Sequence, residues 1–277
     1  MGAFGDFSRI NTNIQSLDAL RRYQMTNQSL GLRQMRLATG SRINRAEDDS
    51  AGFHIAKKLE ARVRGQAQAL ANIGDAKSML TVAEGSLGTV MDILQTMKEK
   101  TVQAANDTMG SSERTAIENE LHALSDEVTD ILGDTTFNST VLFTSATFNF
   151  QVNAESGDSF AVTIGTLSVG QMGIATGSID VSSASVATAL LTTIDTAITT
   201  IADKLADIGD SQKRLTFKQD AISIAITNNE AARSRIADAD FAKEQMEIVK
   251  LQILQQTGTA ALAQANAGPQ SILQLLQ

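Results

Sequence analysis

Residues 201–236 read IADKLADIGDSQKRLTFKQDAISIAITNNEAARSRI, and a large aliphatic side chain recurs in them every seven residues. The repeating positions are Ile201, Ile208, Leu215, Ile222 and Ile236, with Asn229 in the remaining place. A seven-residue apolar period is typical of a helix that packs along other helices in a coiled coil. Polar residues within such a repeat set the register of the pairing at some cost in stability.

A similar period runs through two stretches upstream. Their apolar positions are Leu87, Val90, Leu94 and Met97, followed by Ile117, Leu121, Leu124 and Val128. Between the two stretches stands Gly110-Ser111-Ser112, which ends one helix and offers a serine N-cap to the next. Two helices joined by so short a link are expected to pack antiparallel.

The middle of the chain, residues 134–185, is rich in Thr, Ser, Gly and Phe and poor in charge. Apolar and polar residues alternate over 148–152 and 160–164, and the turn-like sequence ESGD at 155–158 separates the two runs. This alternation predicts a β-hairpin with one buried face. The expected fold is mainly α: long antiparallel helices from both chain ends form a coiled-coil rod, with a small β-hairpin insertion in the middle.

Composition excludes several classes of protein. The 277 residues contain no cysteine, so disulfides and thiolate metal sites are impossible. The sequence has no run of about 18 apolar residues, so it predicts no membrane span. The net charge of -8 argues against nucleic-acid binding. The two histidines, His54 and His122, stand in ordinary helix contexts, and no catalytic motif occurs. We therefore expect no enzymatic activity, no metal and no cofactor.

The two ends of the chain differ in charge and carry small side chains. Residues 1–45 hold seven arginines and two aspartates, whereas residues 238–277 hold two lysines and four acidic groups. Residues 257–268 are almost all Ala, Gly, Gln, Thr and Asn, which gives an isolated helix too little apolar surface. We expect the two ends to attract each other, to be disordered in solution, and to become helical when packed against neighbouring chains.

Four separated motifs resemble those of bacterial flagellins. They are INTN at 10–13, LATGSRINRAEDDSAG at 37–52, AARSRIADAD at 231–240, and an ending that runs from QILQQTG at 252–258 through AQAN at 263–266 to PQSILQLL at 269–276. The match covers roughly residues 9–140 and 186–277. Only about fifty residues join the matching halves, as in a minimal flagellin that lacks the variable outer domains.

The resemblance implies a structural subunit of the flagellar filament that polymerises head-to-tail into a helical tube for swimming motility. Residues 1–45 and 238–277 are then expected to pair as terminal helices in the inner filament core. Residues 46–237 are expected to form the helical rod domain, with the hairpin region at about 134–185. The chain is expected to be secreted, unfolded and without a cleaved signal peptide. The implied partners are copies of itself, an export chaperone, the filament cap and hook–filament junction proteins.

In flagellins, the stretch around residues 42–49 lies where the inner helix bends into the rod. The residues expected to mediate assembly are Arg42, Asn44, Asp48, Asp49, Arg233, Arg235, Leu254, Gln255, Leu262, Leu273 and Leu276. Asp48 and Asp49 also suit the capping of a helix, or pairing with arginine, within one subunit. Both interpretations stay open for these two residues, and for Arg233 and Arg235.

Two further surfaces follow from the resemblance. The animal innate receptor for flagellin binds a site on the family's N-terminal helices. Gln103 and Glu120 match the glutamine and glutamate of that site, whereas Thr96 and Lys100 replace its arginine and leucine. We therefore expect weak receptor recognition. Candidates for O-glycosylation are Ser178, Ser182 and Ser183, with unmodified turn residues as the alternative.

Two other functions compete with the filament subunit. A hook–filament junction protein would also have paired terminal helices. A secreted coiled-coil protein that binds its partner as a monomer would have a similar rod. Such a monomer has no need of underfilled helices at both ends, and this difference favours the filament subunit.

Overall fold

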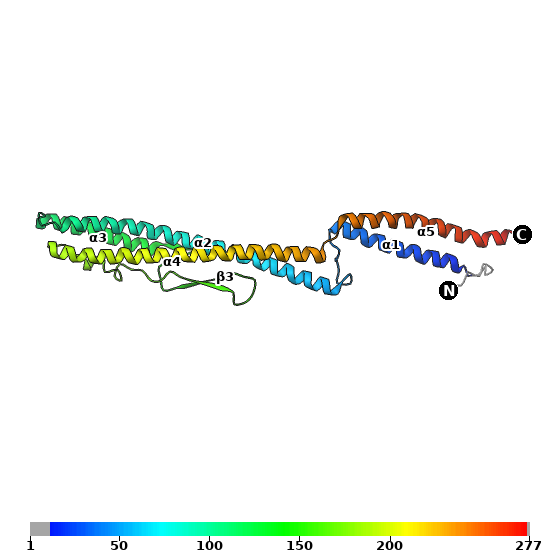
Figure 1. The fold of residues 1–277 in the computed structure, drawn as a ribbon, viewed down its shortest axis with the longest axis horizontal. Helices are drawn as coiled ribbons and strands as arrows, with labels where there is room; N and C mark the ends of the chain where they lie inside the picture. The colour runs from blue at the N-terminus through cyan, green and yellow to red at the C-terminus, as the bar shows by residue number, and fades with distance from the viewer. Residues whose placement is uncertain (1–11, 276–277) are drawn as a thin grey trace. The chain divides into compact units, whose positions relative to one another are not determined.

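The computed structural model describes residues 12–275, with side chains as far as residue 267 (Figure 1). The chain folds into two compact units. The terminal unit consists of the two chain ends, up to residue 61 and from residue 229 onward, and the rod unit consists of residues 62–228.

Three long helices make up most of the rod unit: α2 (Ser50–Ala104), α3 (Ser111–Asp134) and α4 (Ala184–Ala237), of which α2 and α4 begin or end in the terminal unit. They run side by side in Figure 1. Lys98 Nζ lies 2.6 Å from Asp195 Oδ1, and Lys77 Nζ donates to Gln219 Oε1 at 3.2 Å. Because the number of the α4 partner rises as that of the α2 partner falls, α2 and α4 are antiparallel. The predicted bundle of long antiparallel helices is confirmed.

The core of the rod unit is one continuous apolar cluster contributed by all three helices and by the segment between α3 and α4. Leu94, Leu121 and Leu215 are fully buried in it. The predicted seven-residue repeat accounts for the α4 contribution, since Ile201, Ile208, Leu215 and Ile222 are all buried. Each repeat position therefore supplies one layer of the core.

The start of α3 differs from the sequence prediction. Its N-cap is Gly110, not a serine, and no side chain caps the first turn. Ser111 is already helical, and the link to α2 is held by Arg114, which donates to the backbone oxygens of Ala104 and Asn106. The serine N-cap prediction was wrong: Ser111 lies inside the helix, and the Glu113 carboxylate lies over Gly110, where a Cβ would stand only 2.4 Å from Glu113 Oε2. Lys100 and Glu120 pair across α2 and α3, whose antiparallel packing is as expected.

The predicted hairpin is present. Strand β3 (Thr147–Gln151) pairs antiparallel with β4 (Ser159–Thr163), and Phe150 lies opposite Phe160. Phe160 and Val162 face the helices and are buried, while their neighbours are exposed. The Arg214 guanidinium of α4 stacks 4.7 Å from the Phe160 ring centroid, a cation–π contact that fastens the hairpin to the rod.

A second, smaller hairpin precedes it and was not predicted. Strand β1 (Thr136–Phe137) pairs with β2 (Thr140–Val141). Asn138 and Ser139 form the turn with positive φ angles of 48° and 63°. Two-residue strands are too short to show an alternating pattern, so the sequence holds no clear signal for them.

The segment from β4 to α4 contains the 3-10 helix η1 (Thr176–Ser178) and no strand. Leu167, Met172 and Ile174 anchor it in the core, and of these three only Met172 lies in a turn. The buried Ser125 hydroxyl of α3 donates to Ile174 O at 2.7 Å, so the backbone of this segment is tied to the helices.

One stretch of α4 is long and apolar enough to cross a membrane by composition alone, contrary to the expectation that the chain holds no such stretch. Its large side chains, among them Leu190, Ile194 and Ile201, lie in the core of the rod unit. Alanine on the other faces raises the average hydropathy, and threonine adds no charge. Packing against α2 and α3 therefore accounts for this stretch without a membrane.

The terminal unit is built on two helices, α1 (Ile14–Thr39) and α5 (Phe241–Leu275). Arg33 of α1 contacts Glu244 of α5, and Asn27 contacts Gln255, so the helices are antiparallel. Only Leu30 of α1 and Ile248 of α5 are buried apolar residues, among the described side chains of the pair. The pairing of the two chain ends is thus present, with very little core beneath it.

Candidate assembly surface

The connection after α1 is tied by backbone hydrogen bonds to the connection before α5. Gly40 ends α1 in the left-handed conformation, with φ of 68°. The Arg42 N–H donates to Ala237 O at 2.6 Å, and the Ala239 N–H donates to Gly40 O at 2.8 Å. The Arg42 guanidinium adds a bond to Ile236 O at 2.6 Å. These bonds hold the two connections together within one subunit.

Asp48 and Asp49 shape the turn that leads into α2. Asp48 Oδ2 accepts the backbone N–H groups of Asn44 and Arg45, both at 3.0 Å. Asp49 Oδ1 accepts the Gly52 N–H at 2.9 Å and so caps the first turn of α2. A Cβ at Gly52 would stand only 2.5 Å from Asp49 Oδ2, which explains the glycine. Both aspartates therefore act within the chain, and their contact with other subunits stays a prediction.

A buried cluster of charges joins α1, this turn and α5. Arg33 Nη1 donates to both carboxylate oxygens of Glu244 at 2.9 Å. Arg36 lies 4.0 Å from Glu244 and 3.8 Å from Asp48. The side chains of Glu244, Asp48 and Arg36 are only 6%, 8% and 15% exposed. The opposite charges of the two ends predicted attraction, but nothing in the sequence identified these partners.

Asp48 should make the turn sensitive to acid. The N–H groups of Arg45 and Asn44 hold the pKa of the Asp48 carboxyl below its usual value, and Arg36 lowers it further. A carboxyl with a lowered pKa stabilises the folded turn above its unfolded pKa of about 3.9 and loses that effect as the pH falls through the folded value. We expect Asp48→Asn to speed amide exchange of residues 44 and 45 at neutral pH, by a ratio that shrinks below about pH 4. A ratio unchanged by pH would contradict this role for the charge.

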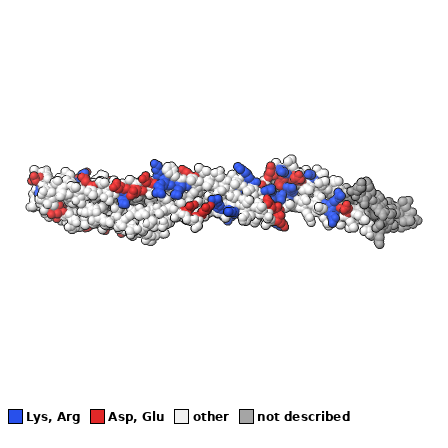
Figure 2. All heavy atoms as spheres, turned by 60° about the horizontal axis from the view of Figure 1, so that its bottom comes forward, with Lys and Arg blue, Asp and Glu red and all other residues white. Residues whose placement is uncertain are grey.

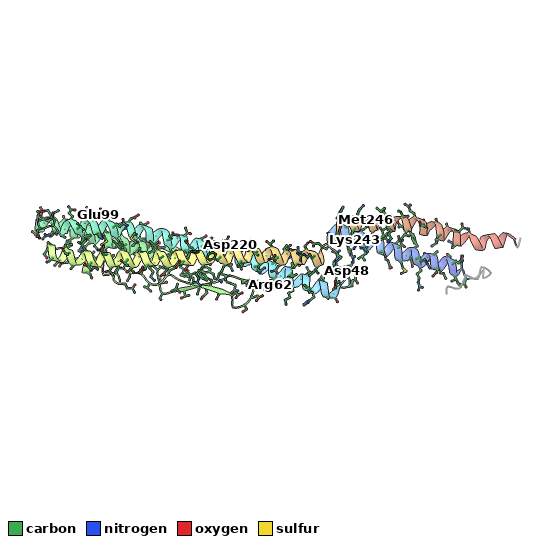
Figure 3. All side chains as sticks on the ribbon, viewed as in Figure 1. Asp48, Arg62, Glu99, Asp220, Lys243 and Met246 are labelled. Atoms are coloured by element: carbon green, nitrogen blue, oxygen red, sulfur yellow. The ribbon has the colours of Figure 1, made fainter. Side chains whose placement is uncertain are left out.

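The outward faces of α1 and α5 carry most of the exposed large apolar residues. Nine of the fourteen in the described part of the chain lie there: Ile14, Leu17, Leu20, Met25, Phe241, Met246, Val249, Ile253 and Leu254. Met246, labelled in Figure 3 near the start of α5, is 67% exposed. Met246, Val249 and Ile253 follow a helical spacing of three and four residues, which puts them on one side of α5. Such a stripe on a unit with few buried residues is typical of a contact surface, and its role in assembly stays a prediction.

The other residues expected to mediate assembly are spread over the terminal unit. Arg233 pairs with Glu230, whose hydrogen bond raises the pKa of Arg233, and Arg235 is exposed. Leu254 belongs to the exposed set, and Leu262 is half-buried. Leu273 and Leu276 lie outside the residues whose side chains the structure describes.

Charge on the surface is mixed in sign. On the face shown in Figure 2, acidic and basic side chains gather in small clusters separated by uncharged surface. Opposite charges in close pairs, such as Lys57–Glu60 and Lys250–Glu247, fit this pattern. This face therefore lacks the concentrated basic patch that binding of a polyanion requires.

Comparison with known proteins assigns the family. The family model for the bacterial flagellin N-terminal helical region matches residues 10–147, and that for the C-terminal helical region matches residues 191–276. Flagellin of Halalkalibacterium halodurans is 36% identical over 271 residues, covering 97% of this chain and 99% of the relative. This chain belongs to the bacterial flagellin family.

Relatives extend across distant bacteria. Flagellin FlaB1 of Treponema pallidum is 35% identical over 284 residues, covering 97% of this flagellin and 99% of the relative. A putative flagellar hook-associated protein from Vibrio parahaemolyticus has a similar structure, with a TM-score of 0.58 over 69% of this chain and 100% of that chain. Its 16% identity shows a shared fold alone.

The family models and the flagellin relatives show what this chain does. This flagellin is a structural subunit that self-associates in the extracellular flagellar filament, and it lacks large outer domains.

The two surfaces carried over from other flagellins lie on the rod unit. Gln103, Glu120 and Thr96 are exposed, and Lys100 Nζ lies 2.7 Å from Glu120 Oε1. Lys100 thus forms an ion pair with Glu120, the carboxylate that matches the receptor site, and this pairing adds a reason to expect weak recognition. That expectation remains a prediction.

Of the three serines considered for O-glycosylation, two are open to solvent. Ser178 and Ser182 are exposed. Ser183 is half-buried, and its hydroxyl accepts the Val186 N–H at the start of α4. A glycan at Ser183 would remove this contact, so Ser178 and Ser182 are the better candidates.

Proposed function

We propose that this flagellin polymerises head-to-tail through the outward faces of α1 and α5. In this arrangement residues 1–45 and 238–277 form the inner filament core, and residues 46–237 form the surrounding rod. The observation that carries the proposal is the set of nine exposed apolar residues on α1 and α5, in a unit with almost no core. Each of these side chains contributes roughly 1.5–3 kcal/mol when it is fully buried.

The scarcity of buried apolar residues in the terminal unit also supports export in an unfolded state. Among described residues, the terminal unit buries four apolar side chains: Leu30, Ile43, Ala56 and Ile248. Burial on this scale scarcely offsets the entropy of ordering two long helices. We infer that the terminal unit orders fully only in the polymer, and that an export chaperone covers the apolar faces on the way out of the cell. The filament cap and the hook–filament junction proteins are the further proposed partners.

Substitution on the α5 stripe tests the proposal. We expect Val249→Asp/Ile253→Asp to raise the critical concentration for seeded assembly by on the order of tenfold or more, because two apolar side chains can no longer be buried between subunits. Electron microscopy and sedimentation measure the polymer. The melting of the unassembled chain should not change, since both residues are exposed.

Two comparison variants make the result specific. Ile253→Leu keeps an apolar side chain and should assemble. Ile224→Asp places a charge at a site of similar exposure on α4, 62% against 59% for Ile253. Normal growth of the double aspartate variant together with failure of Ile224→Asp would move the contact from the terminal helices to the rod.

A further inference from the structure

Most of the half-buried and buried residues of α1 and α5 follow a seven-residue repeat that the sequence did not reveal, and the remaining ones, Asn27, Leu32, Met35, Arg36 and Glu247, lie beside it. On each helix the intervals alternate between three and four residues. The α1 positions are Ser16, Ala19, Tyr23, Thr26, Leu30, Arg33 and Leu37, and the α5 positions are Glu244, Ile248, Leu251, Gln255, Gly258, Leu262 and Ala265. We call these fourteen residues the terminal seam. The repeat is that of an antiparallel two-helix coiled coil.

Apolar packing in the terminal seam is too weak to select one register. Of the fourteen side chains, only Leu30 and Ile248 are apolar and buried, and several others are Ala, Gly, Ser or Thr. A slip of seven residues moves each seam position onto the next equivalent position, so the seam still faces inward. Such a slip would therefore expose little additional apolar surface to water.

Polar contacts along the seam do distinguish the registers. Four hydrogen-bonded contacts join α1 and its N-cap residue Asn13 to α5: Asn13 Nδ2 to Ala265 O at 2.8 Å, Ser16 Oγ to Asn266 Oδ1 at 2.7 Å, Gln255 Nε2 to Asn27 Oδ1 at 2.7 Å, and Arg33 Nη1 to Glu244 at 2.9 Å. We call this set the polar ladder. After a seven-residue slip Arg33 would face Leu251, and Glu244 would no longer receive the two hydrogen bonds that Arg33 donates to it.

We propose that the polar ladder fixes the register of α1 against α5, and that assembly of the polymer requires this register. The second half of the proposal rests on the proposed function. A hydrogen-bonded charge pair adds little net stability, but a buried charge without its partner is strongly unfavourable. The ladder therefore acts against wrong registers more than it stabilises the right one.

The register matters because the same contact repeats in every subunit of a helical polymer. Seven residues of helix measure about 10.5 Å, so a slipped pair would displace the outward residues of α1 from those of α5 by that distance. A neighbour that fits Leu17 and Ile253 in one register cannot meet both in the other. One mismatch would then recur at each step of the polymer.

The absence of cysteine from the chain permits a direct measurement of register. A Cβ at Gly258 would lie 4.0 Å from the Cβ of Tyr23, which suits a disulfide. Tyr23→Cys/Gly258→Cys therefore reports the observed register. Tyr23→Cys/Ala265→Cys and Tyr23→Cys/Leu251→Cys report slips of seven residues in either direction.

The test combines these reporters with removal of two contacts of the polar ladder, Asn27–Gln255 and Arg33–Glu244. The ladder variant carries Asn27→Leu, Gln255→Leu, Arg33→Leu and Glu244→Leu, which replace polar partners by apolar ones on both sides. Oxidation of the full chain, before and after seeded assembly, is followed by a non-reducing gel that separates crosslinked monomer from dimer. The matched control, Gln24→Leu/Gln252→Leu, changes exposed polar residues of α1 and α5.

With the ladder intact, and in the control, the Tyr23/Gly258 reporter should crosslink at least about tenfold more than either slip reporter, because a disulfide cannot span a shift of one repeat. In the ladder variant a slip reporter should approach the yield of the in-register one, with helix content retained. Slip reporters that stay uncrosslinked in the ladder variant would overturn the register role. Normal filaments from a slipped variant would overturn the link to assembly. The aspartate variants of α5 test the assembly surface separately.

Discussion

A chain trimmed to residues 46–237 is expected to stay folded and monomeric, and to add nothing to filament seeds. The trimmed chain keeps α2, α3, α4 and both hairpins, which contain the whole continuous core. It lacks α1 and α5, and with them nine exposed apolar side chains. Because each contributes roughly 1.5–3 kcal/mol on burial, their removal should abolish assembly and not merely slow it.

Circular dichroism, sedimentation and electron microscopy check this expectation together. The trimmed chain should show high helix content and a cooperative thermal transition while the full chain, handled in parallel, elongates seeds. Filaments grown from the trimmed chain would show that the rod unit carries the contacts by itself. An unfolded trimmed chain would contradict the independence of the rod core.

The second large effect concerns that core. Leu121→Ala should destabilise the rod unit by about 2–5 kcal/mol, because Leu121 is fully buried and truncation leaves a cavity between the helices. For a unit of this size the melting temperature should fall by roughly 5–15 °C. Thermal unfolding of the trimmed chain measures this without interference from the terminal helices.

The matched control for Leu121→Ala is Ile224→Ala. Ile224 is 62% exposed on the same unit, so its truncation should change the free energy of unfolding by no more than about 0.5 kcal/mol. The ratio of the two effects tests whether the three helices share one packed core. Equal effects would mean that the Leu121 site collapses around the smaller side chain or that the helices pack loosely.

Much of the rod could be predicted because its signals are local. The seven-residue repeat through Ile201, Ile208 and Leu215 indicated a helix and its buried face, and the alternation around Phe160 indicated a strand. Periods of this kind depend only on backbone geometry, which is the same wherever the helix or strand lies. The small β1–β2 hairpin and the glycine N-cap of α3 escaped because each rests on one or two residues.

The terminal unit was harder to predict. Small and polar residues obscure the repeat of the terminal seam, so that only its pattern of burial shows it. Asp48 and Asp49 were recognised as capping or pairing groups, but their partners could not be chosen from sequence. A carboxylate can accept from any nearby N–H, and the chain path through Gly40 and Arg42 determines which N–H groups are near.

The sequence by itself determined the helical class, the hairpin, and, through four ordered motifs, the family. Only the tertiary structure decided that Glu244 meets Arg33 and Arg36, that Asn27 meets Gln255, and that the apolar residues of α1 and α5 point outward without a core beneath them. The physical reason is the distance along the sequence over which each interaction acts. Periodicity and capping act within a few residues, whereas these contacts join residues more than two hundred positions apart, and folding alone sets their register.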